Sequence, residues 1–312
     1  MSADFESIGP AAGLFDFQVN GFGGVDFQRD GLTGEELRRA ARALRRHGPA
    51  RILATFITDE VDRLEVRIAG FERLLDEDGE TRATIPGYHL EGPWLRPEPG
   101  YCGAHPPGPM HAPRIEEFER LQAAARGRIR LVTLAPEWPG SAAFIREIVG
   151  RGVRVSLGHT NAGNGEIDAA IAAGARFCTH LGNGTPPALP RHDNIVQRLL
   201  ARDELTACFI PDGAHLPPFV LRNFVRAKPS GRVLFTTDAM AAAGAPPGRY
   251  TLGAMTVDVE ADGVPRQPGE EGFAGSALTP DEGVRRTAAY LGWTAAEAAR
   301  VWAASAAAFG VA

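Results

Sequence analysis

Short runs of apolar residues alternate with longer segments of helical period along most of the chain. The short runs are rich in Val, Ile, Leu and Phe, which is typical of strands buried on both faces of a sheet. We expect eight strands, within residues 13–21, 50–58, 84–92, 129–137, 153–160, 175–183, 205–213 and 232–240. We expect helices between them, among others at 33–48, 113–127, 141–152, 165–176 and 218–228. Strands that alternate with helices predict parallel βα units.

Eight βα units predict an α/β fold of the closed (β/α)8, or TIM-barrel, type, and 312 residues suit one such domain. A doubly wound open sheet is the competing topology, but no Gly-x-Gly-x-x-Gly sequence opens a helix after a strand. Residues 241–275 break the alternation and contain a hairpin signal at Asp262 and Gly263, so we expect a small β insertion after strand eight. The prediction is one catalytic barrel domain over 13–312, with the insertion at about 245–275 and an N-terminal extension over 1–12.

Two further helices are expected at the end of the chain, over 279–292 and 294–310. Each begins with a threonine that is followed three residues later by a glutamate, Thr279 with Glu282 and Thr294 with Glu297. This spacing predicts a capping box at the start of both helices.

Polar side chains fall at the ends of six of the eight expected strands. These residues are Gln18, Asn20, Glu91, His159, His180, Asp212, His215 and Asp238. In a barrel the carboxyl ends of the strands converge on one face, where active sites lie. Scattered core histidines would not follow strand ends so regularly, so the pattern predicts a functional site.

Glu91, His159 and His180 supply the donor types of a catalytic metal centre. Two imidazoles and one carboxylate are common zinc ligands, and a catalytic site keeps a further position open for water. We therefore predict a divalent metal held by these three residues, while each of them taken alone would more often be an ordinary buried polar residue. Asp238 follows the eighth strand and could take a proton from a water molecule in the site. Its alternative role is to cap a following helix.

Composition narrows the class further. The net charge is −5 and no basic stripe alternates with aromatic residues, so nucleic acid is not an expected partner. The Arg-rich stretch at 37–48 fits the solvated face of an amphipathic helix. No apolar run is long enough to span a membrane, and the N-terminus lacks a signal-peptide pattern. The three cysteines are not paired in spacing, which is typical of a reducing compartment, and we expect a cytoplasmic protein.

Ordered motifs along the chain resemble a known family. GYHLEGPW, YCGAHPP, VSLGHTNA, THLGNGTPP, IPDGAHLPP, TTDAMAAAG and AGSALT occur in this order. Together they resemble the N-acetylglucosamine-6-phosphate deacetylases of the amidohydrolase superfamily. The resemblance implies a metal-dependent barrel that hydrolyses the N-acetyl group of an amino-sugar phosphate, N-acetylglucosamine 6-phosphate, to acetate and glucosamine 6-phosphate.

The resemblance also implies residue roles. Glu91, His159 and His180 match the metal ligands, and Asp238 matches the catalytic acid and base. Gln18 and Asn20 match the place of a second metal site, of which they would be remnants, so one metal is expected. The implied substrate-binding residues are His105, Asn183, Gly184, Arg191 and His215. Zinc is the expected ion, although the donor set also suits iron, cobalt or manganese. The partners implied are a small amino-sugar phosphate and, by analogy with the family, a second copy of the chain in a homodimer.

The sequence departs from the family pattern at two places. The small β domain that precedes and follows the barrel in the family is not expected here, because the first strand motif already begins near Asp16. The phosphate loop reads HLGNGTPP, with Gly182, Gly184 and Thr185 where bulkier or different residues are expected. Two alternatives therefore stay open: an amidohydrolase for another N-acyl or cyclic amide, and a non-catalytic barrel used as a binding module.

Overall fold

A parallel eight-stranded sheet forms the centre of the computed structural model, which describes residues 13–48, 51–269 and 272–311. The strands are β1 (Phe15–Val19), β4 (Arg51–Ile57), β5 (Gly87–Glu91), β6 (Ile129–Leu134), β7 (Arg154–Leu157), β8 (Phe177–Cys178), β9 (Thr206–Phe209) and β10 (Val233–Phe235). Each strand pairs in parallel with the next one along the chain, so the sheet order follows the sequence. This confirms the predicted (β/α)8 barrel.

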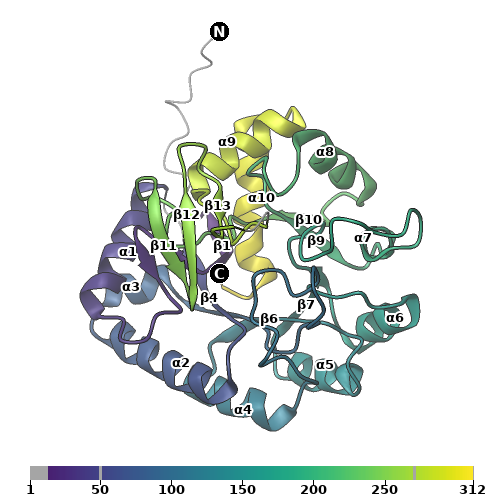
Figure 1. Ribbon diagram of the computed structural model, residues 1–312, viewed down its shortest axis with the longest axis horizontal. Helices are drawn as coiled ribbons and strands as arrows, with labels where there is room; N and C mark the ends of the chain where they lie inside the picture. The colour runs from purple at the N-terminus through teal and green to yellow at the C-terminus, as the bar shows by residue number, and fades with distance from the viewer. Residues whose placement is uncertain (1–12, 49–50, 270–271, 312) are drawn as a thin grey trace.

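Helices surround the strands, and their colours pass around the sheet from purple α1 to yellow α9, with α3 beside α1 and α10 nearer the centre of the view (Figure 1). They are α1 (Gly34–Arg46), α2 (Val61–Asp76), α3 (Gly79–Thr84), α4 (Ile115–Ala124), α5 (Ser141–Gly150), α6 (Asn164–Ala173), α7 (Ile195–Leu200), α8 (Pro218–Ala227), α9 (Pro280–Leu291) and α10 (Ala295–Ala308). Among the residues that the structure describes, no helix has the length and apolar character needed to cross a bilayer.

The seam between the first and last strands is held differently from the other strand pairs. A parallel bridge joins Val19 to Ala239, and the Asn20 N–H donates to the Ala239 carbonyl at 2.7 Å. Along β1, Asp16 pairs with Ile52 and Val19 pairs with Ala54, so β1 carries one extra residue. The bulge lies directly before Asn20, and bulges are frequent beside active sites.

The opposite end of the barrel is filled by apolar side chains. The ring of Phe309, just after α10, lies 4.8 Å from the rings of both Phe17 and Phe177. Buried aromatic pairs at such distances add packing energy to their burial. The segment at the end of α10 therefore packs into the floor of the barrel, in one apolar cluster with Phe17 and Phe177.

The predicted β insertion after strand eight is confirmed as a separate three-stranded sheet of β11 (Gly248–Leu252), β12 (Met255–Val259) and β13 (Pro265–Arg266). The hairpin expected at Asp262 and Gly263 joins β12 to β13, and a second tight turn precedes β12. A short hairpin of β2 (Gly21–Phe22) and β3 (Val25–Asp26) anchors the insertion. The Asp26 carboxylate accepts hydrogen bonds from the Thr251 hydroxyl and the Gly253 N–H, both at 2.9 Å.

Of the two predicted capping boxes at the end of the chain, one is confirmed. Thr294 and Glu297 cap each other at the start of α10. The prediction for α9 was wrong, because Thr279 makes no side-chain cap and donates to Asp281 instead. Glu282 is drawn to Arg285 and Arg286, and charge-assisted pairs of this kind outweigh a neutral cap.

The Arg-rich helix α1 does present a solvated face, as predicted, with Leu37 and Leu44 buried beneath it. Its first turn carries a capping box of Thr33 and Glu36, which was not among the predicted ones. The Glu36 carboxylate also pairs with Arg29 at 2.5 Å. The hydrogen bond from Arg29, together with those from Thr33, lowers the pKa of Glu36 to about 2.

We expect the substitution Glu36→Gln to destabilise the protein by about 0.5–1 kcal/mol near neutral pH, since glutamine keeps the cap but loses the ion pair. The folded-state pKa of Glu36 is below its ordinary value of 4.5. Its contribution is therefore complete above about pH 4.5 and is lost as the pH falls towards 2. Urea unfolding of the wild type and the variant, from neutral to acidic pH, measures the difference in their free energies of unfolding. This difference should become smaller as the pH falls. A difference that stays constant with pH would contradict this account.

Candidate active site

Three of the strand-end residues have an unusual backbone conformation. His159, His180 and Asp238 follow β7, β8 and β10, and their φ angles are +50°, +27° and +51°. Residues with a Cβ seldom adopt this left-handed region, and such strain persists only where the surrounding contacts hold it. All three side chains line the same cavity, so the unusual backbone turns bring these residues together in one site.

The Glu91 carboxylate is the centre of the polar cluster. Its Oε1 lies 3.1 Å from His180 Nε2 and 3.4 Å from His159 Nε2, and the two imidazole nitrogens are 3.1 Å apart. Burial alone would raise the pKa of Glu91, but its interactions with His159 and His180 outweigh it and hold the pKa well below its usual range. The carboxylate is therefore ionised and can act as a ligand.

The spacing of these three atoms fits a metal ion. Zinc bonds of about 2.0–2.1 Å in a tetrahedral site place neighbouring donors about 3.3–3.4 Å apart. His159 Nδ1 lies 2.8 Å from the Tyr101 carbonyl oxygen, to which it donates its proton, and this leaves Nε2 free to bind. The Nδ1 atom of His180 is buried without a hydrogen-bond partner in the described part of the chain. The donor set thus fits a divalent cation.

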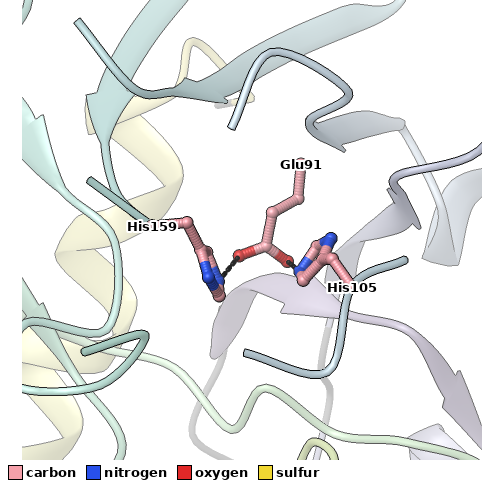
Figure 2. A group of neighbouring side chains, drawn as sticks. All are labelled: Glu91, His105 and His159. Carbon is pink, nitrogen blue, oxygen red and sulfur yellow. Dashed lines mark ion pairs between the residues drawn. The ribbon is translucent and has the colours of Figure 1, made fainter. Parts of the chain in front are cut away.

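His105 also approaches Glu91, with its Nε2 3.6 Å from Oε2, and Figure 2 shows the carboxylate between the rings of His105 and His159. Glu91, His105 and His159 could thus form another metal-binding group. The Thr58 N–H donates to His105 Nδ1 at 3.3 Å, so Nδ1 is an acceptor and the proton sits on Nε2. In this arrangement His105 Nε2–H is a hydrogen-bond donor towards Glu91 and the cavity. His180 Nε2 lies closer to the carboxylate, at 3.1 Å, and His180 as the third ligand stays a prediction.

Asp238 lies beside the cluster and is held by Asn20, whose Nδ2 donates to Oδ1 at 2.8 Å. Gln18 donates in the same way to Glu91, at 3.1 Å. The two amides therefore touch the carboxylates of the site. Burial, followed by the charge of Glu91, raises the pKa of Asp238 to about 7. A carboxyl group with such a pKa can both accept and release a proton near neutral pH.

The cavity has a volume of about 840 Å³ and is lined by most of the residues predicted for the site. Lining residues from the prediction are Asn20, Glu91, His105, His159, His180, Asn183, Gly184, His215 and Asp238. A volume of this size accommodates a small organic ligand. Arg191 is exposed and is not among the residues that line the cavity, so the structure does not bring it together with the others.

At the far side of the cavity His215 is fixed by Asp212, whose Oδ2 lies 2.6 Å from Nδ1. Burial opposes a charge on His215, but the hydrogen bond and the charge of Asp212 outweigh it and raise the pKa of His215 above its usual value.

Gly184 has a φ of +62°, and a Cβ there would lie only 2.8 Å from His159 Nδ1. A glycine is therefore required at this position for the loop to pack on the His159 ring.

Sequence reasoning missed residues that hold the site together from outside the cavity. Glu137 accepts hydrogen bonds from the Thr160 hydroxyl and from the Asn161 N–H, the latter at 2.9 Å, directly after His159. Thr58 fixes His105, and Asp16 holds the end of β10 before Asp238. Only Asp16 gave a signal in the sequence, as a charged residue in the middle of an apolar strand.

Comparison with known proteins is consistent with this geometry. The N-acetylglucosamine-6-phosphate deacetylase of Danio rerio is 36% identical over 80% of this chain and 63% of that protein. The N-acetylgalactosamine-6-phosphate deacetylase of Escherichia coli O157:H7 is 33% identical over 95% of this chain and 76% of its own length. The structure of a mutant N-acetyl-D-glucosamine-6-phosphate deacetylase from Mycobacterium smegmatis, in complex with N-acetyl-D-glucosamine-6-phosphate, aligns with a TM-score of 0.85 and 34% identity over 96% of this chain and 77% of that one. No family model matches the chain.

The fold and the site together define a (β/α)8 barrel of the amidohydrolase type. Within that class, the identities and the structural alignment show that the chain belongs to the N-acetylglucosamine-6-phosphate deacetylase family. The chain spans 63% of the length of the Danio rerio relative.

Proposed function

We propose that this chain hydrolyses the N-acetyl group of N-acetylglucosamine 6-phosphate, giving acetate and glucosamine 6-phosphate. The observation that carries the proposal is the convergence of Glu91, His159, His180 and Asp238 on one cavity at the strand ends. A metal-binding set beside a carboxyl group that can move a proton is an arrangement that can catalyse amide hydrolysis.

Glu91, His159 and His180 would hold one divalent cation, and we take zinc as the ion because two imidazoles and a carboxylate are common zinc ligands. When bound, the cation would polarise the acetamide carbonyl and lower the pKa of a water molecule in the cavity. Gln18 and Asn20 offer amides instead of histidines at the neighbouring position, and both already donate to carboxylates, which supports one metal site instead of two.

Asp238 takes a proton from the attacking water and later gives it to the amine that leaves. The hydrogen bond from Asn20 fixes its Oδ1, so Oδ2 remains for this exchange. His105 is neutral, since burial lowers its pKa to about 3, and it carries its proton on the nitrogen that faces Glu91. Its Nε2–H would donate to the acyl oxygen as negative charge develops there, a contribution typically worth about 100- to 1,000-fold in rate.

The sugar and its phosphate would occupy the rest of the cavity. His215, Asn183 and Gly184 line it and can offer one imidazole, one amide and main-chain N–H groups. Among the described lining residues there is no lysine or arginine. In this proposal Arg191 meets the phosphate from the exposed loop between β8 and α7, since the fork of a guanidinium matches phosphate oxygens.

The proposal also includes a homodimer in the cytoplasm. The three cysteines, Cys102, Cys178 and Cys208, are free, as is usual in a reducing compartment. Light scattering of the purified protein tests the oligomeric state, and fractionation of the native cells tests the location.

Acetate release from three substrates tests the proposed specificity. N-acetylglucosamine 6-phosphate should exceed unphosphorylated N-acetylglucosamine by about 10- to 100-fold in kcat/KM, because hydrogen bonds to a charged group contribute about 1.5–3 kcal/mol each. N-acetylgalactosamine 6-phosphate, as the third substrate, tests the choice of sugar isomer. Equal rates with and without phosphate would favour an amidohydrolase for other N-acyl compounds, and binding without hydrolysis would favour a binding module.

A further inference from the structure

Asp16 is a buried carboxylate that the proposed chemistry does not use. It lies in the middle of β1, its exposed fraction is 0%, and it is not among the residues that line the cavity. Four donors face it: the Thr236 hydroxyl at 2.5 Å, the Thr237 hydroxyl at 2.5 Å, the Thr237 N–H at 3.1 Å and the Gln18 N–H at 3.3 Å. A buried carboxylate is costly unless it is satisfied in this way, so its retention calls for an explanation.

The contacts of Asp16 lie at the seam between β1 and β10, where the described residues form an isolated bridge in place of a regular ladder. β10 forms its regular hydrogen-bond ladder with β9. Across the seam to β1, the Thr237 N–H donates to the Asp16 side chain and not to a strand carbonyl. Asp16 also accepts from Gln18 inside the bulge of β1. One carboxylate thus joins the end of β10 to the bulged strand that carries Gln18 and Asn20.

The hydrogen bonds that Asp16 accepts from Thr236 and Thr237, here called the Asp16 clamp, continue around Asp238. The Thr237 hydroxyl donates to Asp16 and accepts the Ala239 N–H at 3.1 Å, so both neighbours of Asp238 are tied to the same carboxylate. On the other side, the Ser276 N–H donates to the Asp238 carbonyl at 2.8 Å. Asp238 itself has a φ of +51°, a conformation that the chain leaves when its surroundings do not hold it.

We propose that Asp16 is a positioning residue, which acts through Thr236 and Thr237 to hold Asp238 in its left-handed turn, within reach of Asn20 and the cavity. The inference rests on the proposed function, since it takes Asp238 as the group that moves the proton. A carboxylate that only stabilised the barrel would have no particular relation to Asp238. Asp16 and Asp238 should instead be energetically coupled in the reaction.

A double-mutant cycle tests this coupling. Asp16→Asn keeps the size of the side chain but replaces one acceptor oxygen by a donor that faces the threonine donors. We expect kcat to fall by about 10- to 100-fold, as small misplacements of a reacting group do, while KM and metal content change little. In the Asp238→Asn background the same substitution should cost less than about twofold, because the group that it positions is already gone.

The partner side of the clamp offers a rescue experiment. Thr237→Val removes the hydroxyl and keeps the branched shape, so it should reproduce the loss of kcat, whereas Thr237→Ser keeps the hydroxyl and should retain most of the activity. Glu72→Gln is the matched control, since Glu72 is also a buried carboxylate, 1% exposed and bound by Tyr88 and Arg128, but lies outside the cavity. It should lower the melting temperature and leave kcat unchanged.

Two results would overturn the proposal. The first is that Asp16→Asn lowers kcat by the same factor in the wild type and in the Asp238→Asn background. The second is that Glu72→Gln also lowers kcat, with the same ratio of lost kcat to lost melting temperature as Asp16→Asn. Crystal structures of the wild type and Asp16→Asn give a readout that does not depend on activity. The variant should show Asp238 out of the left-handed region and its contact with Asn20 lost. An unchanged Asp238 contradicts the inference. A wild-type protein that hydrolyses none of the tested amides is a different result, which contradicts the proposed function.

Discussion

Replacing Asp238 with asparagine lowers kcat for amide hydrolysis by about 100- to 10,000-fold, the usual contribution of a general acid and base. Asparagine has nearly the same shape and still offers an oxygen to the Asn20 side chain, which now donates at 2.8 Å. The substitution therefore removes the proton exchange and leaves the local structure intact. Steady-state kinetics with the substrate in excess measures the effect.

The physical reason is the position of Asp238 rather than its charge alone. It is 8% exposed, and it lines the same cavity as the Glu91, His159 and His180 cluster. Metal content and melting temperature of the variant should match those of the wild type, which separates lost chemistry from lost structure. Activity within about threefold of the wild type would mean that Asp238 does not move the proton, since an acid–base contribution is far larger.

The second large effect is expected from Glu91→Gln, which should abolish both metal binding and hydrolysis. The carboxylate supplies the negative charge of the donor set, and its Oε1 is within 3.4 Å of both histidine nitrogens. A neutral amide loses the charge attraction to a divalent cation and fits a hard ligand position poorly. Elemental analysis should give about one metal per wild-type chain and close to none for the variant.

Glu117→Gln provides the matched control for Glu91→Gln. Glu117 also pairs with a histidine, His111, at 2.8 Å, but this pair lies outside the cavity. The control variant should keep its metal and its activity. Full metal content in Glu91→Gln, or equal loss in both variants, would contradict the assignment of Glu91 as a ligand.

The sequence predicted the barrel and the collection of polar groups at its open end because both follow from simple periodicity. Runs of apolar residues that end in Glu91, His159 or Asp238 place these groups at strand ends, and a parallel barrel brings strand ends together. The positions of the helices likewise follow from apolar spacing, as the buried Leu37 and Leu44 of α1 illustrate.

Long-range contacts explain what the sequence did not reveal. The left-handed turn at Asp238 depends on Asp16, which is more than two hundred residues away along the chain. The capping box predicted for α9 failed because Arg286 attracts Glu282, and Arg286 also donates to the Asp212 carbonyl beside His215. His105 and His180 both reach Glu91 only in the folded structure, with their Nε2 atoms 3.6 Å and 3.1 Å from its carboxylate. The first and last of these relations have no local pattern, whereas Arg285 and Arg286 lie three and four residues after Glu282 and form ordinary helical pairs with it.

The most direct test of the central claim is acetate release from N-acetylglucosamine 6-phosphate by the zinc-loaded protein, with Glu91→Gln beside it. The account predicts a kcat/KM of about 10⁴ M⁻¹s⁻¹ or above for the wild type, in the ordinary range of enzymes, and no release above background for the variant. A wild-type protein that holds about one zinc per chain and releases no acetate from this substrate would contradict the account.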